Sequence, residues 1–325
     1  MKRTKWIAAA LCIALFFSGC AKEQDQEKHI FGATYMTRNN PYFDVLNDEI
    51  AEGVEANGDK LIVRDPLQDQ EKQNQQILDM INEGIEILFL NPVDKVKVKP
   101  ALKACQEAGV EIINIDTQVD DTDYVLSTIE TDNYQAGQEC AKDMMKRVDS
   151  ARIIILDNPM QDSIVQRVHG FLDTIEGHPE YQVVQQIFSG GEIEISAEVV
   201  SGLLDEDFNV VFGGNDPSAL GALAALQKAG REEGILIYGV DGSPDFKAML
   251  DLGYVTGTSS QSPETIGKTA TEMAYQALDG KAVEKYVKLP SRLITNENLM
   301  NNDIDGWQED EKKSNEHYQT VLFSD

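Results

Sequence analysis

Carboxylates and amides recur where apolar segments of the chain end, and they are the residues best able to hold a ligand. The series comprises Asn91, Asp116, the pairs Asp157–Asn158 and Asn215–Asp216, and Asp241. In open parallel sheets, ligands bind outside the carboxyl ends of the strands, so this series favours a polar ligand site at a sheet edge. Each residue taken alone is equally compatible with an ordinary helix N-cap or turn.

The segment 37–50, TRNNPYFDVLNDEI, adds an unusual loop to that series. The preceding HIFGATY is rich in β-branched and aromatic residues and predicts a strand. Apolar residues recur at three- and four-residue spacing from Phe43 to Val54, which predicts one apolar face of a helix. Such a helix needs a single N-cap, whereas the run Asn39-Asn40-Pro41 offers more than one. We therefore expect the loop to have a second task.

No arrangement of residues predicts catalysis or metal binding. The chain has four histidines, and none has the spacing of HExxH or another zinc motif. It contains no Walker A loop, GxSxG elbow or GxGxxG fingerprint. His169 is predicted to be an ordinary helix residue. We expect a protein that is not an enzyme and has no cofactor or metal, with a hydrolase or isomerase as the alternative.

Strands and helices alternate along most of the chain. Apolar runs predict strands at 61–65, 85–91, 110–116, 151–157, 181–188, 209–216, 235–241 and 254–260. Helical patterns lie between them, as at 69–84, 132–148 and 216–230, and several end in a glycine. This alternation predicts an α/β fold with parallel sheets covered on both faces. About ten such units exceed one open sheet and indicate two α/β domains of similar size.

The N-terminus has the pattern of a lipoprotein export signal. Three cations precede an apolar run over residues 6–17 that is too short for a stable membrane span. The run ends in Ser18-Gly19-Cys20, which resembles the bacterial lipobox, so residues 1–19 are predicted to be removed and Cys20 to be lipid-modified. Residues 20–29 then form a polar tether. A plain signal peptide or an uncleaved anchor is the alternative.

The remaining composition restricts partners and redox chemistry. With 56 acidic and 28 basic residues, the chain has a formal net charge of −28, which argues against nucleic-acid binding. Cys105 and Cys140 remain once the N-terminal cysteines are accounted for. Each lies in a helical pattern, and their spacing indicates neither a disulfide framework nor a metal site, so we predict two separate buried thiols.

Taken together, these motifs resemble the ribose/galactose-type sugar-binding proteins that serve bacterial ABC importers. The resemblance runs from about residue 30 to 295. It is carried, in the family's order, by NNPYF, LNPVD, INID, TDNYQAG, QRVHGF, GGNDPSALGALAALQKAG, YGVDGSPD and GTSSQSPETIG. It implies the periplasmic binding protein type I fold, with two doubly wound parallel-sheet (Rossmann-like) lobes joined by a three-crossing hinge.

The resemblance also implies where the lobes begin and end. The crossings are expected near Thr131–Asp132, Gln261–Ser262 and Leu289–Arg292. The implied units are residues 30–131 plus 262–290 for the N-terminal lobe, 132–261 plus 291–310 for the C-terminal lobe, and 311–325 for a C-terminal extension.

Eight positions match the family's ligand-binding residues: Asn40, Tyr42, Phe43, Asp116, Arg167, Asn215, Asp241 and Gln261. Carboxylates, amides and the guanidinium fork suit the hydroxyls of a neutral sugar, and aromatic rings pack on its C–H face. The resemblance thus assigns the loop at 37–50 a task in ligand binding. We expect Arg167 and Asp241 to hold the same ring in a closed cleft and to be hydrated in an open one.

Two departures from the family pattern keep the ligand open. Thr117 stands directly after Asp116, where many members have an arginine, and Met36 replaces a small polar residue. The implied ligand is therefore a monosaccharide or polyol rather than ribose in particular. A sugar phosphate is disfavoured because Arg167 is the only cation among the matched positions.

The implied function is that of a solute-binding lipoprotein anchored through Cys20 to the outer face of the bacterial cell membrane. We expect a monomer that delivers its ligand to the permease subunits of an ABC transporter. The alternative is a sensor module that presents the ligand to a membrane receptor or kinase. A transcription regulator on the same fold would need an N-terminal helix-turn-helix where the export signal stands.

Overall fold

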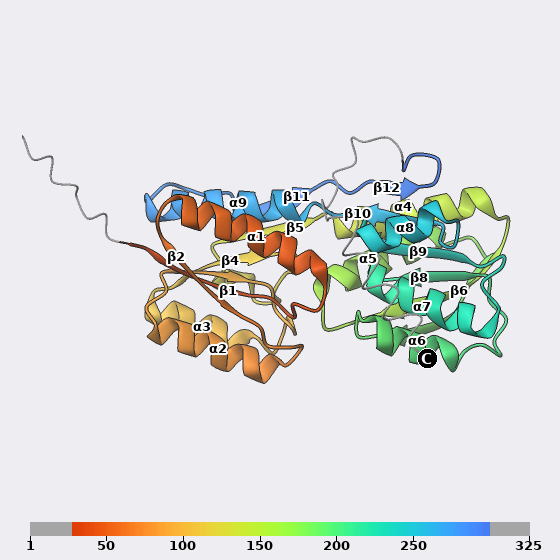
Figure 1. Ribbon diagram of the computed structural model, residues 1–325, viewed down its shortest axis with the longest axis horizontal. Helices are drawn as coiled ribbons and strands as arrows, with labels where there is room; N and C mark the ends of the chain where they lie inside the picture. Colours follow the sequence, from red (N-terminus) through yellow and green to blue (C-terminus); the bar gives the residue numbers. More distant parts are fainter. Residues whose placement is uncertain (1–27, 300–325) are drawn as a thin grey trace, which may run out of the picture.

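The computed structural model describes residues 28–299, which form two α/β lobes placed side by side along the long axis of the molecule (Figure 1). The predicted export signal 1–19, the lipidation site Cys20 and the extension 311–325 lie outside the described residues. So do most of the predicted tether and the part of the predicted C-terminal lobe beyond residue 299. Within the described part, no helix combines the length and apolar character needed to cross a membrane.

The N-terminal lobe is built on a six-stranded sheet in the order β11-β5-β4-β3-β1-β2. All of its strand pairs are parallel. The strands are β1 (Ile30–Thr34), β2 (Lys60–Arg64), β3 (Ile87–Leu90), β4 (Glu111–Ile115), β5 (Ser127–Thr131) and β11 (Tyr286–Leu289). Its helices are α1 (Pro41–Ala56), α2 (Gln70–Asn82), α3 (Lys99–Ala108) and α9 (Pro263–Leu278), with a 3₁₀ turn η1 (Thr122–Tyr124).

Alternate strand residues point to opposite faces of this sheet and build two separate apolar clusters. One cluster packs under α1 and α9, and the other packs under α2 and α3. Figure 1 shows the two helix pairs on opposite sides of the sheet. The sheet therefore lies buried between two helical layers, as parallel sheets require.

The C-terminal lobe repeats the arrangement with the order β12-β10-β9-β8-β6-β7. Its strands are β6 (Ala151–Asp157), β7 (Tyr181–Phe188), β8 (Val210–Gly213), β9 (Leu236–Asp241), β10 (Gly257–Ser260) and β12 (Leu293–Thr295). Only β12 runs antiparallel, against β10. The helices are α4 (Asn133–Arg147), α5 (Asp162–Ile175), α6 (Ile193–Ser201), α7 (Asp216–Ala229) and α8 (Pro244–Asp251). Helices α4 and α5 cover one apolar cluster, and α6 to α8 cover the other.

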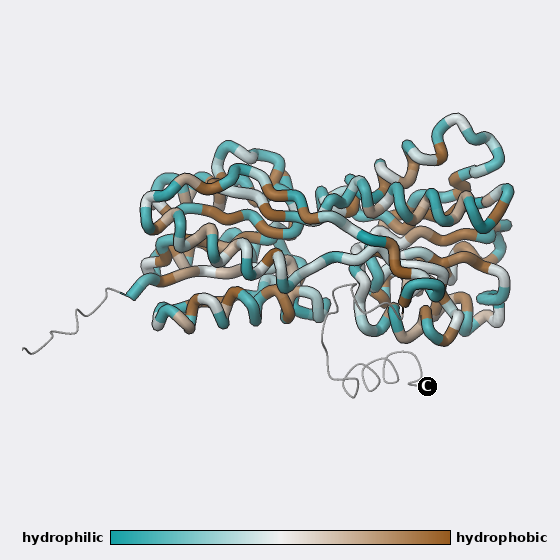
Figure 2. Tube along the Cα trace, turned by 90° about the horizontal axis from the view of Figure 1, so that it is seen from above, coloured by the Kyte–Doolittle hydropathy of each residue, from teal (hydrophilic) through white to brown (hydrophobic). Residues whose placement is uncertain are grey.

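The predicted fold class and its two parallel-sheet lobes are confirmed, and most predicted strands are found with small shifts at their ends. The predictions 151–157 and 181–188 coincide with β6 and β7. The predicted strand 209–216 is too long, because α7 begins at Asp216 with Asn215 as its N-cap. Hydrophobic residues concentrate along the strands inside each lobe (Figure 2), which is why the apolar runs located them.

Predictions for single residues outside the site are also confirmed. His169 is exposed on α5. Cys105 and Cys140 are both buried and free, and burial raises the pKa of each thiol to about 12. Both thiols are therefore protonated at neutral pH and act as small apolar core groups.

The chain passes between the two sheets three times. The first passage joins β5 to α4, the second joins β10 to α9, and the third joins β11 to β12. Each is only a few residues long, and Figure 1 shows these connections gathered on one side of the molecule. Movement of the lobes about these passages stays a prediction.

Candidate functional site

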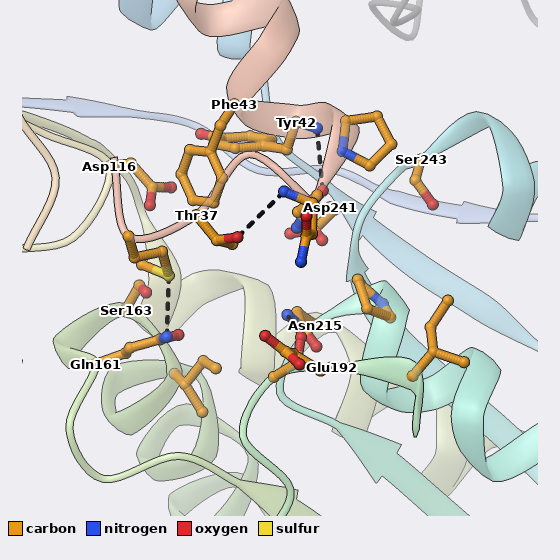
Figure 3. Close-up of a pocket in the computed structure, with 18 of the residues that line it drawn as sticks. Thr37, Tyr42, Phe43, Asp116, Gln161, Ser163, Glu192, Asn215, Asp241 and Ser243 are labelled. Atoms are coloured by element: carbon orange, nitrogen blue, oxygen red, sulfur yellow. Dashed lines mark hydrogen bonds between the residues drawn. The ribbon is translucent and has the colours of Figure 1, made fainter. Parts of the chain in front are cut away.

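A cavity of about 610 Å³ lies between the lobes and takes side chains from both. This volume is in the range of pockets that enclose small molecules. All eight positions matched from the sequence line it: Asn40, Tyr42, Phe43, Asp116, Arg167, Asn215, Asp241 and Gln261. Figure 3 shows Tyr42 and Phe43 on the side of the N-terminal lobe, across from Asn215 and Glu192 of the C-terminal lobe. The structure thus brings together residues that are more than 200 positions apart in the sequence.

The loop before α1 both caps the helix and contributes to the cavity. The Asn40 side chain accepts a hydrogen bond from the Tyr42 backbone N–H at 3.0 Å, and Pro41 occupies the first helical turn. The rings of Tyr42 and Phe43 meet edge to face with centroids 5.2 Å apart. Both rings are fully packed, with exposed fractions of 2% and 4%. The cap fixes the backbone, and the two rings that follow it form a rigid apolar wall.

Two carboxylates of the site lie at strand ends, where their backbone has the positive φ that favours glycine. Asp116, directly after β4, has φ 63°, and Asp241, the last residue of β9, has φ 149°. Positive φ is uncommon for residues with a side chain and is often found at functional sites. Asn91 donates to Asp116 at 2.8 Å, and Gln261 Nε2 donates to Asp241 Oδ1 at 2.7 Å. Each carboxylate is therefore held in place before any ligand arrives.

Arg167 on α5 reaches the same part of the cavity. It donates from Nε to Asn133 Oδ1 and from a terminal nitrogen to the Gly214 carbonyl, both at 2.8 Å. Its guanidinium lies 3.7 Å from Asp241 Oδ1, and both side chains are almost fully buried. In this structure the protein itself surrounds and pairs Arg167 and Asp241, and their hydration in an open cleft stays a prediction.

Burial dominates the electrostatics of these groups. It raises the pKa of Asp116 and Asp241, and Arg167 opposes the rise at both. A third buried carboxylate, Asp216, stands behind Asp241 and raises its pKa further. Burial also raises the pKa of Tyr42 well above its ordinary value, with Asp116 as a hydrogen-bond partner. In this site one guanidinium therefore serves several buried carboxylates.

Only part of the strand-end series reaches the cavity. Asn91, the Asp157–Asn158 pair and Asp216 do not line it. Asp216 accepts hydrogen bonds from the Ser243 N–H at 2.8 Å and from the Thr258 hydroxyl at 2.7 Å, and it thereby joins the start of α7 to the N-cap of α8 and to β10. For these residues the expected place at a ligand edge is wrong, and the alternative of cap and turn chemistry applies.

Sequence reasoning missed further lining residues on the C-terminal lobe, notably Gln161, Ser163 and Glu192. Gln161 and Glu192 are the N-cap positions of α5 and α6, directly after β6 and β7 in the chain. The strand-end rule therefore applies to them as well. It did not find them because a few turn residues separate each one from its strand.

The two positions that depart from the family pattern connect the lobes. Thr117 and Ser163 form a short hydroxyl–hydroxyl contact, and Gln161 Nε2 donates to the Met36 sulfur at 2.9 Å. A third connection is the ion pair between Lys95 and Asp162 at 2.8 Å. These contacts close one side of the cavity in this structure.

The site consists of hydrogen-bonding groups and aromatic rings. Within residues 28–299, no group of three or more histidine, cysteine or acidic side chains is placed to hold a metal ion. Such an arrangement can enclose a small polar molecule and satisfy its hydrogen bonds.

Comparison with known proteins identifies a family model and relatives that this chain resembles over most of its length. The family model described as a periplasmic binding protein domain matches residues 31–282. The chain is 29% identical over 306 residues to the ribose import binding protein of Bacillus subtilis, covering 90% of this chain and 99% of the relative. It is likewise 29% identical over 290 residues to the ribose import binding protein of Escherichia coli, with 88% and 97% covered.

Among solved structures, an ABC transporter solute binding protein from Bacillus halodurans with bound myo-inositol superimposes with a TM-score of 0.80. The two chains are 22% identical, and the match covers 86% of this chain and 98% of the other. At this identity the likeness concerns the fold. Since the family model spans well over half of the sequence and the same two-lobed architecture recurs in the solved structure, this chain belongs to the periplasmic binding protein family.

Proposed function

We propose that this protein is an extracytoplasmic solute-binding protein that captures a monosaccharide or polyol between its lobes and delivers it to an ABC transporter permease. The observation that carries the proposal is the convergence of eight residues from both lobes on one cavity. There, Asp241 Oδ2 and Gln261 Oε1 are buried and have no hydrogen-bond partner among the described residues. A polyhydroxyl ligand donates hydrogen bonds in several directions and would satisfy them.

The comparisons support transport as the setting. The two ribose relatives are import proteins by name, which favours delivery to a permease over presentation to a sensor kinase. The relatives are binding proteins, and we propose that this chain likewise binds its ligand without turnover. Incubation with each sugar that binds, followed by NMR of the mixture, should return the sugar unchanged.

A thermal-shift screen over monosaccharides and polyols tests the binding proposal. A ligand that binds only the folded state must raise the melting temperature, and the rise grows with the ratio of ligand concentration to Kd. Asp241→Asn should weaken the response because it removes the charge that faces Arg167. His169→Ala is the matched control, since His169 lies exposed on the same helix as Arg167. A panel in which no sugar or polyol shifts the parent protein would refute the proposed ligand class.

We further propose that the lobes close on the ligand by a hinge movement. The moving units are 30–131 plus 262–290 and 132–261 plus the segment from 291. The contacts that join the lobes on one side of the cavity are few and polar, so they can break at modest free energy. Small-angle scattering should give a smaller radius of gyration with saturating ligand. An unchanged radius despite calorimetrically proven binding would contradict closure.

Anchoring and oligomeric state complete the proposal. Cys20 is proposed as the lipidated residue that holds the protein at the outer face of the cell membrane, and the lipobox-like Ser18-Gly19-Cys20 supports it. We propose that the chain binds its ligand as a monomer, because its own two lobes supply both walls of the cavity. Light scattering of the protein without its proposed membrane anchor should give the mass of one copy, both with and without ligand.

A further inference from the structure

The lining of the cavity is short of positive charge. Of its charged side chains six are acidic and two are basic: Asp44, Asp116, Glu192, Glu194, Asp241 and Asp245 against Arg38 and Arg167. Arg38 is also engaged, because its Nε donates to Asp44 at 2.7 Å. One guanidinium, that of Arg167, therefore remains for the interior of the site.

Arg167 does not balance the carboxylates around it. It lies 3.7 Å from Asp241 and acts on Asp116 and Asp216 as well, so three buried carboxylates share one cation. Burial raises the pKa of all three groups, and a further positive charge beside them would favour their ionised forms. Thr117, directly after Asp116, contributes a hydroxyl and no charge.

The polar atoms left without a partner are acceptors. Asp241 Oδ2 and Gln261 Oε1 belong to side chains that are each 3% exposed, and no described residue donates to them. The two side chains are hydrogen-bonded to each other, so their free oxygens belong to one small region. Glu192 is half-buried, forms no side-chain hydrogen bond or ion pair within residues 28–299, and lines the same cavity (Figure 3). These oxygens call for hydrogen-bond donors on the ligand.

An ammonium group has this chemistry, since it carries three donors, no acceptor and a full positive charge. A hydroxyl donates one hydrogen bond and leaves the excess of carboxylates unchanged. An anionic group would add to the excess. From this balance we infer that the ligand is an amino sugar or amino polyol, whose ammonium lies against Asp241 and Gln261 in the cavity that Glu192 also lines; the inference rests on the proposed sugar-binding function.

Matched pairs of ligands test the charge directly. The probes are D-glucose with D-glucosamine, D-galactose with D-galactosamine, and myo-inositol with an inosamine, titrated calorimetrically below the pKa of the amine. The N-acetyl derivatives of the two hexosamines control for size without charge. In the pair that fits the cavity, the amino member should bind about tenfold more tightly or better, as expected for charge-assisted hydrogen bonds.

A variant pair tests the assigned place of the ammonium. Glu192→Gln keeps the shape of the side chain and removes its charge, so it should reduce the ratio of amino to neutral affinity by about threefold or more. Glu198→Gln, on the exposed face of the same helix and away from the cavity, should leave the ratio unchanged. A loss of stability alone would lower both affinities together and leave the ratio intact.

The outcomes separate this inference from the function on which it rests. Neutral members that bind as tightly as their amino counterparts, or more tightly, overturn the inference and leave sugar binding intact. A protein that binds none of the amino or neutral probes, and no ligand of the wider sugar panel, overturns the proposed function as well. Preference for the amino member together with the loss of preference in Glu192→Gln supports both.

Discussion

Replacement of Arg167 by alanine should weaken ligand binding and destabilise the fold at the same time. For binding, the lost contacts are hydrogen bonds from a buried guanidinium, which contribute about 1.5–3 kcal/mol to affinity, or roughly a ten- to hundredfold change in Kd. For folding, the change leaves Asn133 Oδ1 and the Gly214 carbonyl without their 2.8 Å donor. It also leaves Asp241 without the cation that lies 3.7 Å away. Removing one partner of a buried ion pair typically costs about 3–5 kcal/mol of stability.

Two further variants separate these effects. Arg167→Lys keeps the charge and loses the planar fork, so it should retain more stability than alanine while still binding less tightly. His169→Ala, exposed on the same helix, controls for changes in α5 itself. Denaturant unfolding gives the free energy of unfolding, and calorimetric titration with the best ligand of the thermal-shift screen gives Kd.

The reasoning has two separate points of failure. If Arg167→Ala is destabilised and still binds with the parental Kd, then Arg167 is a structural residue that merely borders the ligand. If the variant has the stability of the parent, the buried carboxylates do not depend on this guanidinium, and the charge shortage inferred for the cavity disappears.

Three other perturbations have defined expectations. Burial raises the pKa of Glu130 on β5 to about 7, from an ordinary value of 4.5, so ionisation of this carboxyl at higher pH opposes folding. The free energy of unfolding of Glu130→Gln should therefore exceed that of the parent by on the order of 3 kcal/mol at pH 8 and by little at pH 4. Equal gains at both pH values would exclude this cause. A methyl group added at Gly137 would lie 1.8 Å from the Arg167 carbonyl oxygen. Gly137→Ala should therefore force α4 away from α5 and lower the free energy of unfolding by about 1–3 kcal/mol or more. An unchanged denaturation midpoint would mean that the two helices adjust freely. Cys20→Ser should move the protein from the membrane fraction to the soluble fraction, because acyl chains contribute about 0.8 kcal/mol per buried methylene; retention in the membrane would point to an uncleaved anchor.

The central strands were predictable because they are buried on both faces. In β6 the residues 153–156 form a continuous, fully buried apolar run, and only a buried parallel strand or a core helix produces that pattern. The strands β5, β11 and β12 escaped prediction for the opposite reason. β5 reads STIET and is buried throughout although three of its five residues are polar hydroxyl residues and one is acidic. Its burial comes from the neighbouring strands and from the passage between the lobes, which no local pattern records.

The site residues were predictable where a local backbone role, such as helix N-capping, coincides with a position of the family pattern. Asn40 and Asn215 are helix N-caps as well as lining residues, so the same side chain satisfies a local rule and a place at the cavity. Gln161 and Glu192 stand at equivalent N-cap positions but do not form a side-chain cap hydrogen bond. Such residues give no local signal, and only the packing of the two lobes shows that they face the ligand space.

The hydrogen bonds of the strand-end residues divide the series into supports and contacts. Asn91 accepts from the Met36 N–H at 3.0 Å and donates to Asp116 at 2.8 Å, so it positions a neighbour. Asn215 similarly accepts from Ser218 and donates to Gly191. Gln261 Nε2 donates to Asp241 Oδ1, which leaves Asp241 Oδ2 and Gln261 Oε1 without a hydrogen-bond partner among the described residues. We therefore expect selection among ligands to depend on Asp241 and Gln261. A change in a residue that positions a neighbour, such as Asn91, should weaken the binding of all ligands by a similar factor.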